Sequence, residues 1–297
     1  MAEGNLASIF AQIRNALNDQ DYPDVIRCCN KALKVAPSDA VVHRTKVVAL
    51  IRVDKYKEAL NAIDHAKKVK LNAELGFHYE RAYCLFRLDR LSEAEKMLAS
   101  MKRSDRVTHL EAQIAYKRGQ FDKAQLAYDQ ILNRAVPPED KEELQINLIA
   151  CKAARAMSSP ADPAEDGQKL IASDDGLSYE QLFNLASAEL AQGRLANAIQ
   201  HFNEAKDVCM TYLKEQGWLD DEIEAELATI KAQLACAEYF SGDAEKARSL
   251  WEDAHRARNV DRTTATLAWC NVLATSTDTV SAKDVTNALK ALGSRSM

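Results

Sequence analysis

Four side chains that suit ligand recognition recur at helical spacing near the end of the first third of the chain. Tyr79, Tyr83, Phe86 and Arg87 are three to four residues apart, so a helix would place them on one face. Aromatic rings beside a guanidinium suit a peptide that carries apolar anchors and acidic groups. Tyr83 and Phe86 could alternatively pack between helices, but the charge of Arg87 gains nothing from a dry contact.

No motif for catalysis accompanies this face. The sequence has no P-loop, no dinucleotide-binding glycine motif, no nucleophile elbow and no His-Glu-x-x-His zinc motif. None of the six histidines has a histidine four residues away or a cysteine at ligand spacing. The acidic run 220–222 is typical of a solvated helix start. We therefore expect a non-enzymatic protein with no cofactor and no metal.

Composition favours an all-α protein. Of the 297 residues, 47% are hydrophobic and 28% charged, with only nine Gly and six Pro. No apolar run approaches the length of a membrane span, and the first residues do not resemble a signal peptide. The seven cysteines are odd in number and form no C-x-x-C pair, so we interpret them as reduced, half-buried side chains of a cytoplasmic protein.

Charge is unevenly distributed between the two halves of the chain. Residues 1–134 hold 23 Lys and Arg against 17 Asp and Glu, whereas residues 135–297 hold 16 against 27. The halves should therefore attract different partners. A dense Lys/Arg run is absent, so direct RNA binding by this segment is the weaker alternative to protein binding.

An internal repeat positions the candidate residues. The phrase Gly/Asp-x-aromatic/Leu-x-x-Ala recurs in six copies, whose small-residue positions are Val25, Ala59, Ala94, Ala124, Ala198 and Ala247. The first four positions are 34, 35 and 30 residues apart, and the last two are 49 apart. This pattern resembles the tetratricopeptide repeat, a helix pair of about 34 residues with small residues at the helix crossing. We expect an all-α, right-handed superhelix of antiparallel helix pairs.

The repeats predict three parts. Residues 1–157 form an N-terminal array of about four repeats plus a degenerate helix at 142–157, and residues 158–177 form an acidic linker that contains Pro and Gly. Residues 178–297 form C-terminal helix pairs, at 178–216 and 220–258, with a last irregular pair at 263–276 and 281–292.

The first helix of each pair lines the concave groove of a tetratricopeptide array. Phasing the second, third and fourth repeats on their small residues predicts which side chains face inward. The predicted groove residues are Arg44, Val48, Ile51, Arg52, Tyr79, Tyr83, Phe86, Arg87, His109, Gln113, Tyr116 and Lys117.

Several blocks carry a more specific resemblance. Lys46–Asp64, Tyr79–Leu98 and Glu111–Leu132 resemble the N-terminal tetratricopeptide domain of the 72 kDa subunit of signal recognition particle. The similarity continues in order over residues 10–275 through the blocks Asn147–Ala154, Phe183–Cys209 and Ala225–Trp251. RAYCLFRLDR is its most specific part, because generic repeats do not share Tyr-Cys-x-x-Arg-Leu at that place.

The resemblance implies a partner and a location. A member of this family would belong to a cytoplasmic ribonucleoprotein, peripheral to the endoplasmic reticulum, that targets ribosomes making secretory proteins. Its concave face would hold a C-terminal segment of the 68 kDa subunit, chiefly through the N-terminal repeats. The family's RNA contacts lie in a Lys-rich C-terminal region that this sequence does not contain. We therefore expect any contact with particle RNA to be indirect or to need that region, and we expect no membrane insertion.

A generic adaptor or co-chaperone is the alternative within the same fold. Co-chaperones of this fold clamp a C-terminal carboxylate with Lys and Asn at fixed places of the repeat. Here Phe10, Arg14 and Thr45 stand at those places, and Gly76 and Glu80 stand where Lys and Arg are needed. The clamp is missing, which leaves another peptide partner as the alternative.

Overall fold

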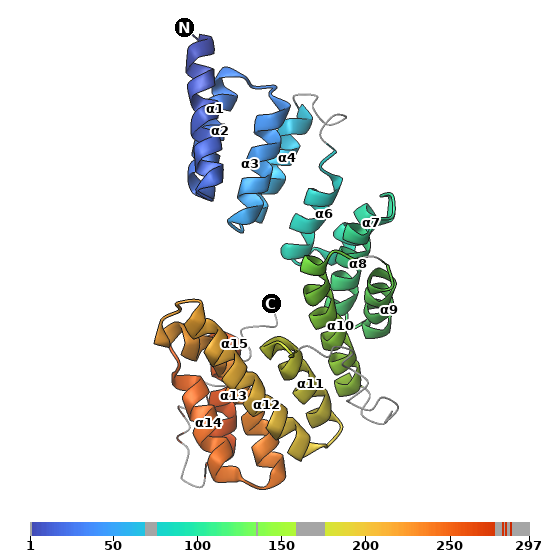
Figure 1. Cartoon of the computed structure of the whole chain (residues 1–297), viewed down its shortest axis with the longest axis vertical. Coiled ribbons are helices and arrows are strands. Elements are labelled where there is room, and N and C mark those ends of the chain that lie inside the picture. Colours follow the sequence, from blue (N-terminus) through green and yellow to red (C-terminus); the bar gives the residue numbers. More distant parts are fainter. Residues whose placement is uncertain are drawn as a thin grey trace. The chain divides into compact units, whose positions relative to one another are not determined.

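The computed structural model describes residues 2–68, 76–134, 136–158 and 176–276, together with residues 281, 283 and 286 (Figure 1). In these ranges it contains fourteen helices and no strand, so the predicted all-α fold class is confirmed. Most of the predicted linker and the predicted helix at 281–292 lie outside the described residues. The chain divides into two compact units, residues 1–127 and 128–297.

The first unit consists of successive antiparallel helices. Its helices are α1 (Ala2–Asn18), α2 (Tyr22–Val35), α3 (Ala40–Arg52), α4 (Tyr56–Lys68), α6 (His78–Arg87), α7 (Leu91–Ala99) and α8 (Asp105–Lys117). Helix α9 (Phe121–Leu132) begins in this unit and ends in the second. Three helix pairs pack together: α1 with α2, α3 with α4, and α6 with α7. Helix α6 also contacts α3 and α8.

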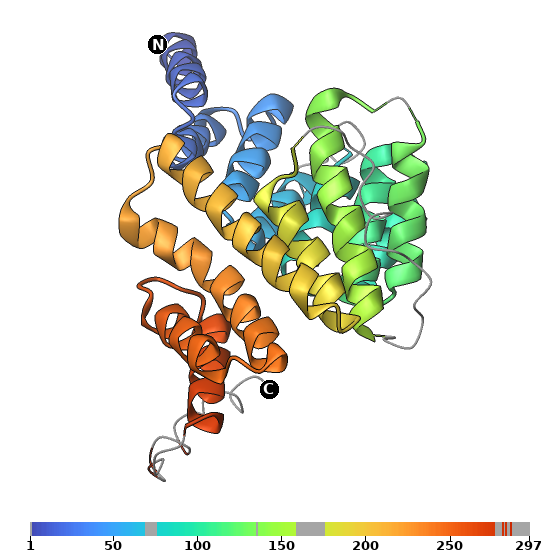
Figure 2. The ribbon, with the colours of Figure 1, turned by 60° about the horizontal axis from the view of Figure 1, so that its bottom comes forward.

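The second unit contains longer helices. They are α10 (Pro138–Ser158), α11 (Tyr179–Ala191), α12 (Leu195–Glu215), α13 (Asp220–Ser241), α14 (Ala244–Arg256) and α15 (Arg262–Ala274). Helix α12 packs against both α11 and α13, and α14 packs against α13 and α15 (Figure 2). This division places α10 in the second unit, whereas the sequence analysis grouped it with the N-terminal array; the predicted part boundaries stay predictions.

Polar side chains mark where several helices begin. The Asp39 carboxylate accepts a hydrogen bond from the backbone N–H of Val42 at 2.9 Å, at the start of α3. Ser178 and Gln181 form a reciprocal capping box at the start of α11. Pro37 lies two residues beyond the end of α2, where a residue that cannot continue a helix is common.

The turn inside each helix pair contains one residue with a positive φ angle. These residues stand at equivalent places in the repeat: Gln20 (55°), Asp54 (58°), Asp89 (60°), Gly119 (71°), Gly193 (73°) and Gly242 (102°). A left-handed conformation favours Gly and is tolerated by residues such as Asp. This requirement explains why five of the six copies of the repeated phrase begin with Gly or Asp.

The small residues of the phrase lie at the helix crossings. Val25, Ala59, Ala94, Ala124, Ala198 and Ala247 are all 0% exposed. Larger apolar side chains fill the space around them, among them Leu50, Ile63 and Leu98 in the first unit and Phe202 and Leu234 in the second. The crossing positions predicted from the sequence are therefore confirmed.

The seven cysteines are free thiols. Cys28, Cys29, Cys84, Cys151 and Cys209 are buried, and Cys236 and Cys270 are partly buried. Burial raises the pKa of Cys84 to about 11 and that of Cys209 to about 12. These thiols act as small apolar residues, in agreement with the interpretation of the sequence, although most are buried more fully than expected.

Replacing Gly242 by Ala should lower the free energy of unfolding by about 1–2 kcal/mol, because an L side chain is strained at positive φ. Gly242 has a φ of 102° and no atom within 4 Å of an added Cβ, so the cost arises from the backbone alone. Urea denaturation measures the effect. Gly176→Ala is the control, since Gly176 also has open space but no positive φ. Equal stability of the two variants would contradict this account of the turns.

Candidate peptide-binding groove

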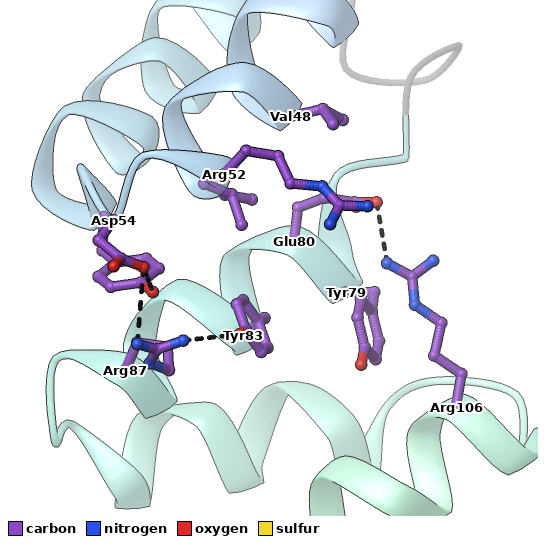
Figure 3. Close-up of a pocket in the computed structure, with 10 residues that line it drawn as sticks. Val48, Arg52, Asp54, Tyr79, Glu80, Tyr83, Arg87 and Arg106 are labelled. Atoms are coloured by element: carbon purple, nitrogen blue, oxygen red, sulfur yellow. Dashed lines mark hydrogen bonds and ion pairs between the residues drawn. The ribbon is translucent and has the colours of Figure 1, made fainter. Parts of the chain in front are cut away.

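A groove of about 430 Å³ opens on the first unit beside helix α6. Helices α3, α6 and α8, the turn after α3 and the first residue of α4 contribute its walls (Figure 3). We call it the aromatic–arginine groove and define it by its lining: Val48, Ile51, Arg52, Asp54, Tyr56, Tyr79, Glu80, Tyr83, Arg87 and Arg106.

Arg87 is fixed in place at one end of this groove. Its guanidinium carbon lies 4.6 Å from the centre of the Tyr56 ring and 5.8 Å from that of Tyr83. Arg87 Nη1 donates a hydrogen bond to Tyr83 Oη at 2.9 Å, and Nη2 lies 3.6 Å from Asp54 Oδ1 (Figure 3). The Asp54 carboxylate also accepts a hydrogen bond from Tyr56 Oη, and burial together with this bond raises the pKa of Tyr56. The cation is therefore oriented before any ligand binds.

A second cation covers an aromatic ring at the other end of the groove. The guanidinium carbon of Arg106 lies 3.5 Å from the centre of the Tyr79 ring, and its Nη2 lies 3.5 Å from Glu80 Oε1 (Figure 3). Burial raises the pKa of the Tyr79 phenol, so this ring stays neutral. The exposed Arg106 side chain thus covers the Tyr79 ring, and a ligand that stacks on this ring would have to displace Arg106.

The contact between Asp54 and Arg87 has a counterpart in the next repeat. Arg87 and Lys117 are the last residues of α6 and α8, and each pairs with the left-handed Asp in the turn of the preceding repeat. The distances are 3.6 Å from Arg87 to Asp54 and 3.8 Å from Lys117 to Asp89. We call these two contacts the turn-aspartate pairs.

Arg52 differs from the cations of the turn-aspartate pairs. It is the last residue of α3, the equivalent place, but Gln20 occupies the corresponding turn of the first repeat. Arg52 is exposed and forms no ion pair within the part of the chain that the structure describes. It is the cation of this groove that is left for an acidic group of a ligand.

The structure brings together half of the predicted groove residues. Six of the twelve line the aromatic–arginine groove: Val48, Ile51, Arg52, Tyr79, Tyr83 and Arg87. The remaining six stand outside its lining: Arg44, Phe86, His109, Gln113, Tyr116 and Lys117. Their part in binding stays a prediction.

Contacts within the first unit occupy several of these outer residues. The Arg44 guanidinium lies over the Phe77 ring, 5.5 Å from its centre. Phe86 is 8% exposed and belongs to the core cluster, with the Lys117 ammonium 4.7 Å from its ring centre. His109 Nε2 and Gln113 Nε2 lie 3.3 Å apart. Phe86 therefore packs chiefly against the core, which was the alternative considered for it.

Four lining residues were not predicted from the sequence: Asp54, Tyr56, Glu80 and Arg106. The prediction covered only the inward places of each first helix, whereas Asp54 lies in the turn and Tyr56 at the start of α4. The repeated phrase could have indicated Asp54 and Tyr56, because in it an Asp stands two places before an aromatic residue. Arg106 lies in the first turn of α8, nearer the helix start than the predicted His109.

Two further features of the described residues are relevant to function. They contain no group of three or more His, Cys, Asp or Glu side chains that could hold a metal ion. No described helix combines the length and the apolar character needed to cross a membrane.

Comparisons with known proteins agree with this architecture. A family model described as "Putative TPR-like repeat" matches residues 28–154, and one described as "Tetratricopeptide repeat" matches residues 152–208. A solved structure, the human IFIT1 dimer with m7Gppp-AAAA, aligns with a TM-score of 0.51 at 16% identity, over 92% of this chain and 66% of that chain. That likeness shows the fold alone. The family models together match tetratricopeptide-like repeats over residues 28–208.

The chain is also similar to signal recognition particle subunit SRP72 of several organisms. It is 31% identical to SRP72 of Schistosoma mansoni over 278 residues, which cover 92% of this chain and 37% of the relative. It is 28% identical to human SRP72 over 262 residues, which cover 86% of this chain and 37% of the relative. The resemblance seen in the sequence is confirmed, and the chain spans somewhat over a third of the length of these relatives.

Proposed function

We propose that this chain is a non-enzymatic scaffold of signal recognition particle, which holds a C-terminal segment of the 68 kDa subunit in the aromatic–arginine groove. The observation that carries the proposal is the combination of the fixed Arg87 and the unpaired Arg52 in one groove of an SRP72 relative. In this role the chain is cytoplasmic and supports co-translational targeting to the endoplasmic reticulum.

The groove suits a peptide with an apolar anchor next to an acidic group. Val48 and Ile51 of α3 face the same groove as the Tyr83 ring and offer apolar surface for the anchor. Arg52 and Arg87 provide charge-assisted hydrogen bonds for a carboxylate. Since contacts within the protein already orient Arg87, binding orders few side chains and the entropic cost on the protein side is small.

RNA is the less suitable occupant of this groove. Asp54 and Glu80 line it together with the cations, and their carboxylates would repel phosphate groups. Asp54 also compensates part of the charge of Arg87. A mixed lining of this kind favours a peptide that can place individual charges over a uniformly anionic backbone.

Affinity capture from cytosol tests the proposed partner. The chain of residues 1–297 should retain the 68 kDa subunit after nuclease treatment, and Arg52→Glu should reduce the retained amount strongly, as measured by mass spectrometry. Arg52 is exposed and unpaired among the described residues, so this variant should fold normally. Lys57→Glu is the matched control, because Lys57 is exposed on α4 and does not line the groove. Retention of chaperones instead, or loss of the subunit on nuclease treatment, would contradict the proposal.

A further inference from the structure

A second groove lies on the second unit. Two cavities of about 310 and 410 Å³ share Ile146, Tyr179 and Glu180 in their linings, so they are adjoining parts of one depression. Helices α10, α11, α12 and α13 contribute to it. We call it the acidic groove and define it by its lining: Glu142, Glu143, Ile146, Ser178, Tyr179, Glu180, Phe183, Asn184, Val208, Tyr212, Glu226, Thr229 and Ile230.

Aromatic and aliphatic side chains form the apolar part of this groove. The rings of Tyr179 and Tyr212 lie 6.3 Å apart, and Tyr212 is 50% exposed. Phe183 packs edge-on against the buried Phe202, with ring centres 5.7 Å apart, which fixes its position. Such surfaces bind apolar side chains and the aliphatic stems of Lys and Arg.

The charge of the acidic groove is of one sign. Four glutamates line it, and its lining contains no Lys, Arg or His. Within the described part of the chain, no cation forms an ion pair with Glu142, Glu180 or Glu226. Burial, together with the nearby Glu180 and Glu226, raises the pKa of the Tyr179 phenol. The charge at Glu142, Glu180 and Glu226 is therefore negative and is not balanced by an ion pair among the described residues.

We infer that the acidic groove binds a peptide segment of a partner protein in which Lys or Arg flanks an apolar side chain. The cations pair with the glutamates, while the apolar side chain lies against Ile146 and Phe183. A cation also gains from the exposed face of Tyr212. The aromatic–arginine groove has the opposite preference, so the chain contains one groove for an acidic segment and one for a basic segment.

Charge separates this occupant from nucleic acid. Phosphate groups would meet four carboxylates, and residues 135–297 carry an excess of acidic over basic side chains, 27 against 16. The inference is independent of the function proposed above, because it concerns residues of the second unit only. Either can fail while the other holds.

Fluorescence anisotropy with labelled probes on the full chain tests the inference. The probes are a peptide of alternating Lys and Leu, its counterpart with Glu in place of Lys, and a single-stranded RNA. The Lys/Leu peptide should bind, with an affinity that falls as salt rises, and the RNA should bind far more weakly. The Glu/Leu peptide suits the aromatic–arginine groove instead, so its affinity should not fall when a glutamate of the acidic groove is replaced.

Two variants locate the binding site. Glu226→Lys should weaken binding of the Lys/Leu peptide about tenfold, and Tyr212→Ala about threefold. Glu204→Lys is the matched control, because it changes the net charge equally at an exposed residue of α12 that does not line the groove. This variant should bind the Lys/Leu peptide as tightly as the unmodified chain does. Thermal unfolding checks that all three variants fold. Equal loss of affinity in Glu226→Lys and Glu204→Lys, no binding of the Lys/Leu peptide, or equal binding of the RNA would each overturn the inference.

Discussion

Replacing Arg87 by Glu should weaken binding of a C-terminal peptide of the 68 kDa subunit by about 10- to 100-fold. A hydrogen bond to a charged group contributes about 1.5–3 kcal/mol, and 1.4 kcal/mol corresponds to a tenfold change in affinity. The substitution also places a carboxylate beside Asp54, which lies 3.6 Å from the present guanidinium. Repulsion between the two carboxylates would add to the loss. Isothermal titration calorimetry of the chain with the synthetic peptide measures the effect.

Two controls separate binding from folding at this position. Arg87→Lys keeps the charge but loses the planar contact with the Tyr56 ring, so it should retain part of the affinity. Lys57→Glu makes the same charge reversal on an exposed residue that does not line the groove and should leave affinity unchanged. If Arg87→Glu folds as the unmodified chain does and binds the peptide equally well, the aromatic–arginine groove is not the binding site.

Replacing Phe202 by Ala should lower the free energy of unfolding of the second unit by about 3–5 kcal/mol. Phe202 is 0% exposed and packs against Phe183 on the neighbouring helix, so truncation leaves a cavity that rigid helices cannot fill. All three tryptophans, Trp218, Trp251 and Trp269, lie in this unit. Tryptophan fluorescence during urea denaturation therefore reports on the unit that contains the substitution.

Phe240 provides the matched control for this measurement. It lies in the same unit but is 67% exposed, so Phe240→Ala should change stability by less than about 0.5 kcal/mol. Similar midpoints for the two variants would show that Phe202 does not contribute to the core in the way its burial indicates. The same experiment would then question the packing of α11 against α12.

The repeat architecture was predictable because its requirements are local. A small residue is needed wherever two helices cross closely, and a left-handed residue is needed in each tight turn. Ala59 and Asp54 satisfy these two needs within one short phrase, and the phrase recurs along the chain. The complete burial of each small residue follows from a pattern visible in the sequence.

The lining of the groove was less predictable because it depends on contacts between repeats. Helical spacing alone placed Phe86 beside Tyr83 and Arg87, but tertiary packing turned Phe86 into the core. Asp54 reaches the groove through its left-handed turn, which orients its carboxylate toward the following repeat. Arg106 reaches the groove from the first turn of α8, whereas the first inward residue predicted on this helix was His109.

The turn-aspartate pairs make the junction between repeats directional. The third repeat presents a cation, Arg87, toward the preceding repeat and a carboxylate, Asp89, toward the following one. Such complementary ends mean that a tandem copy of residues 55–89 could be inserted with its charges matched at both new junctions. In terms of these ion pairs, the array is extendable.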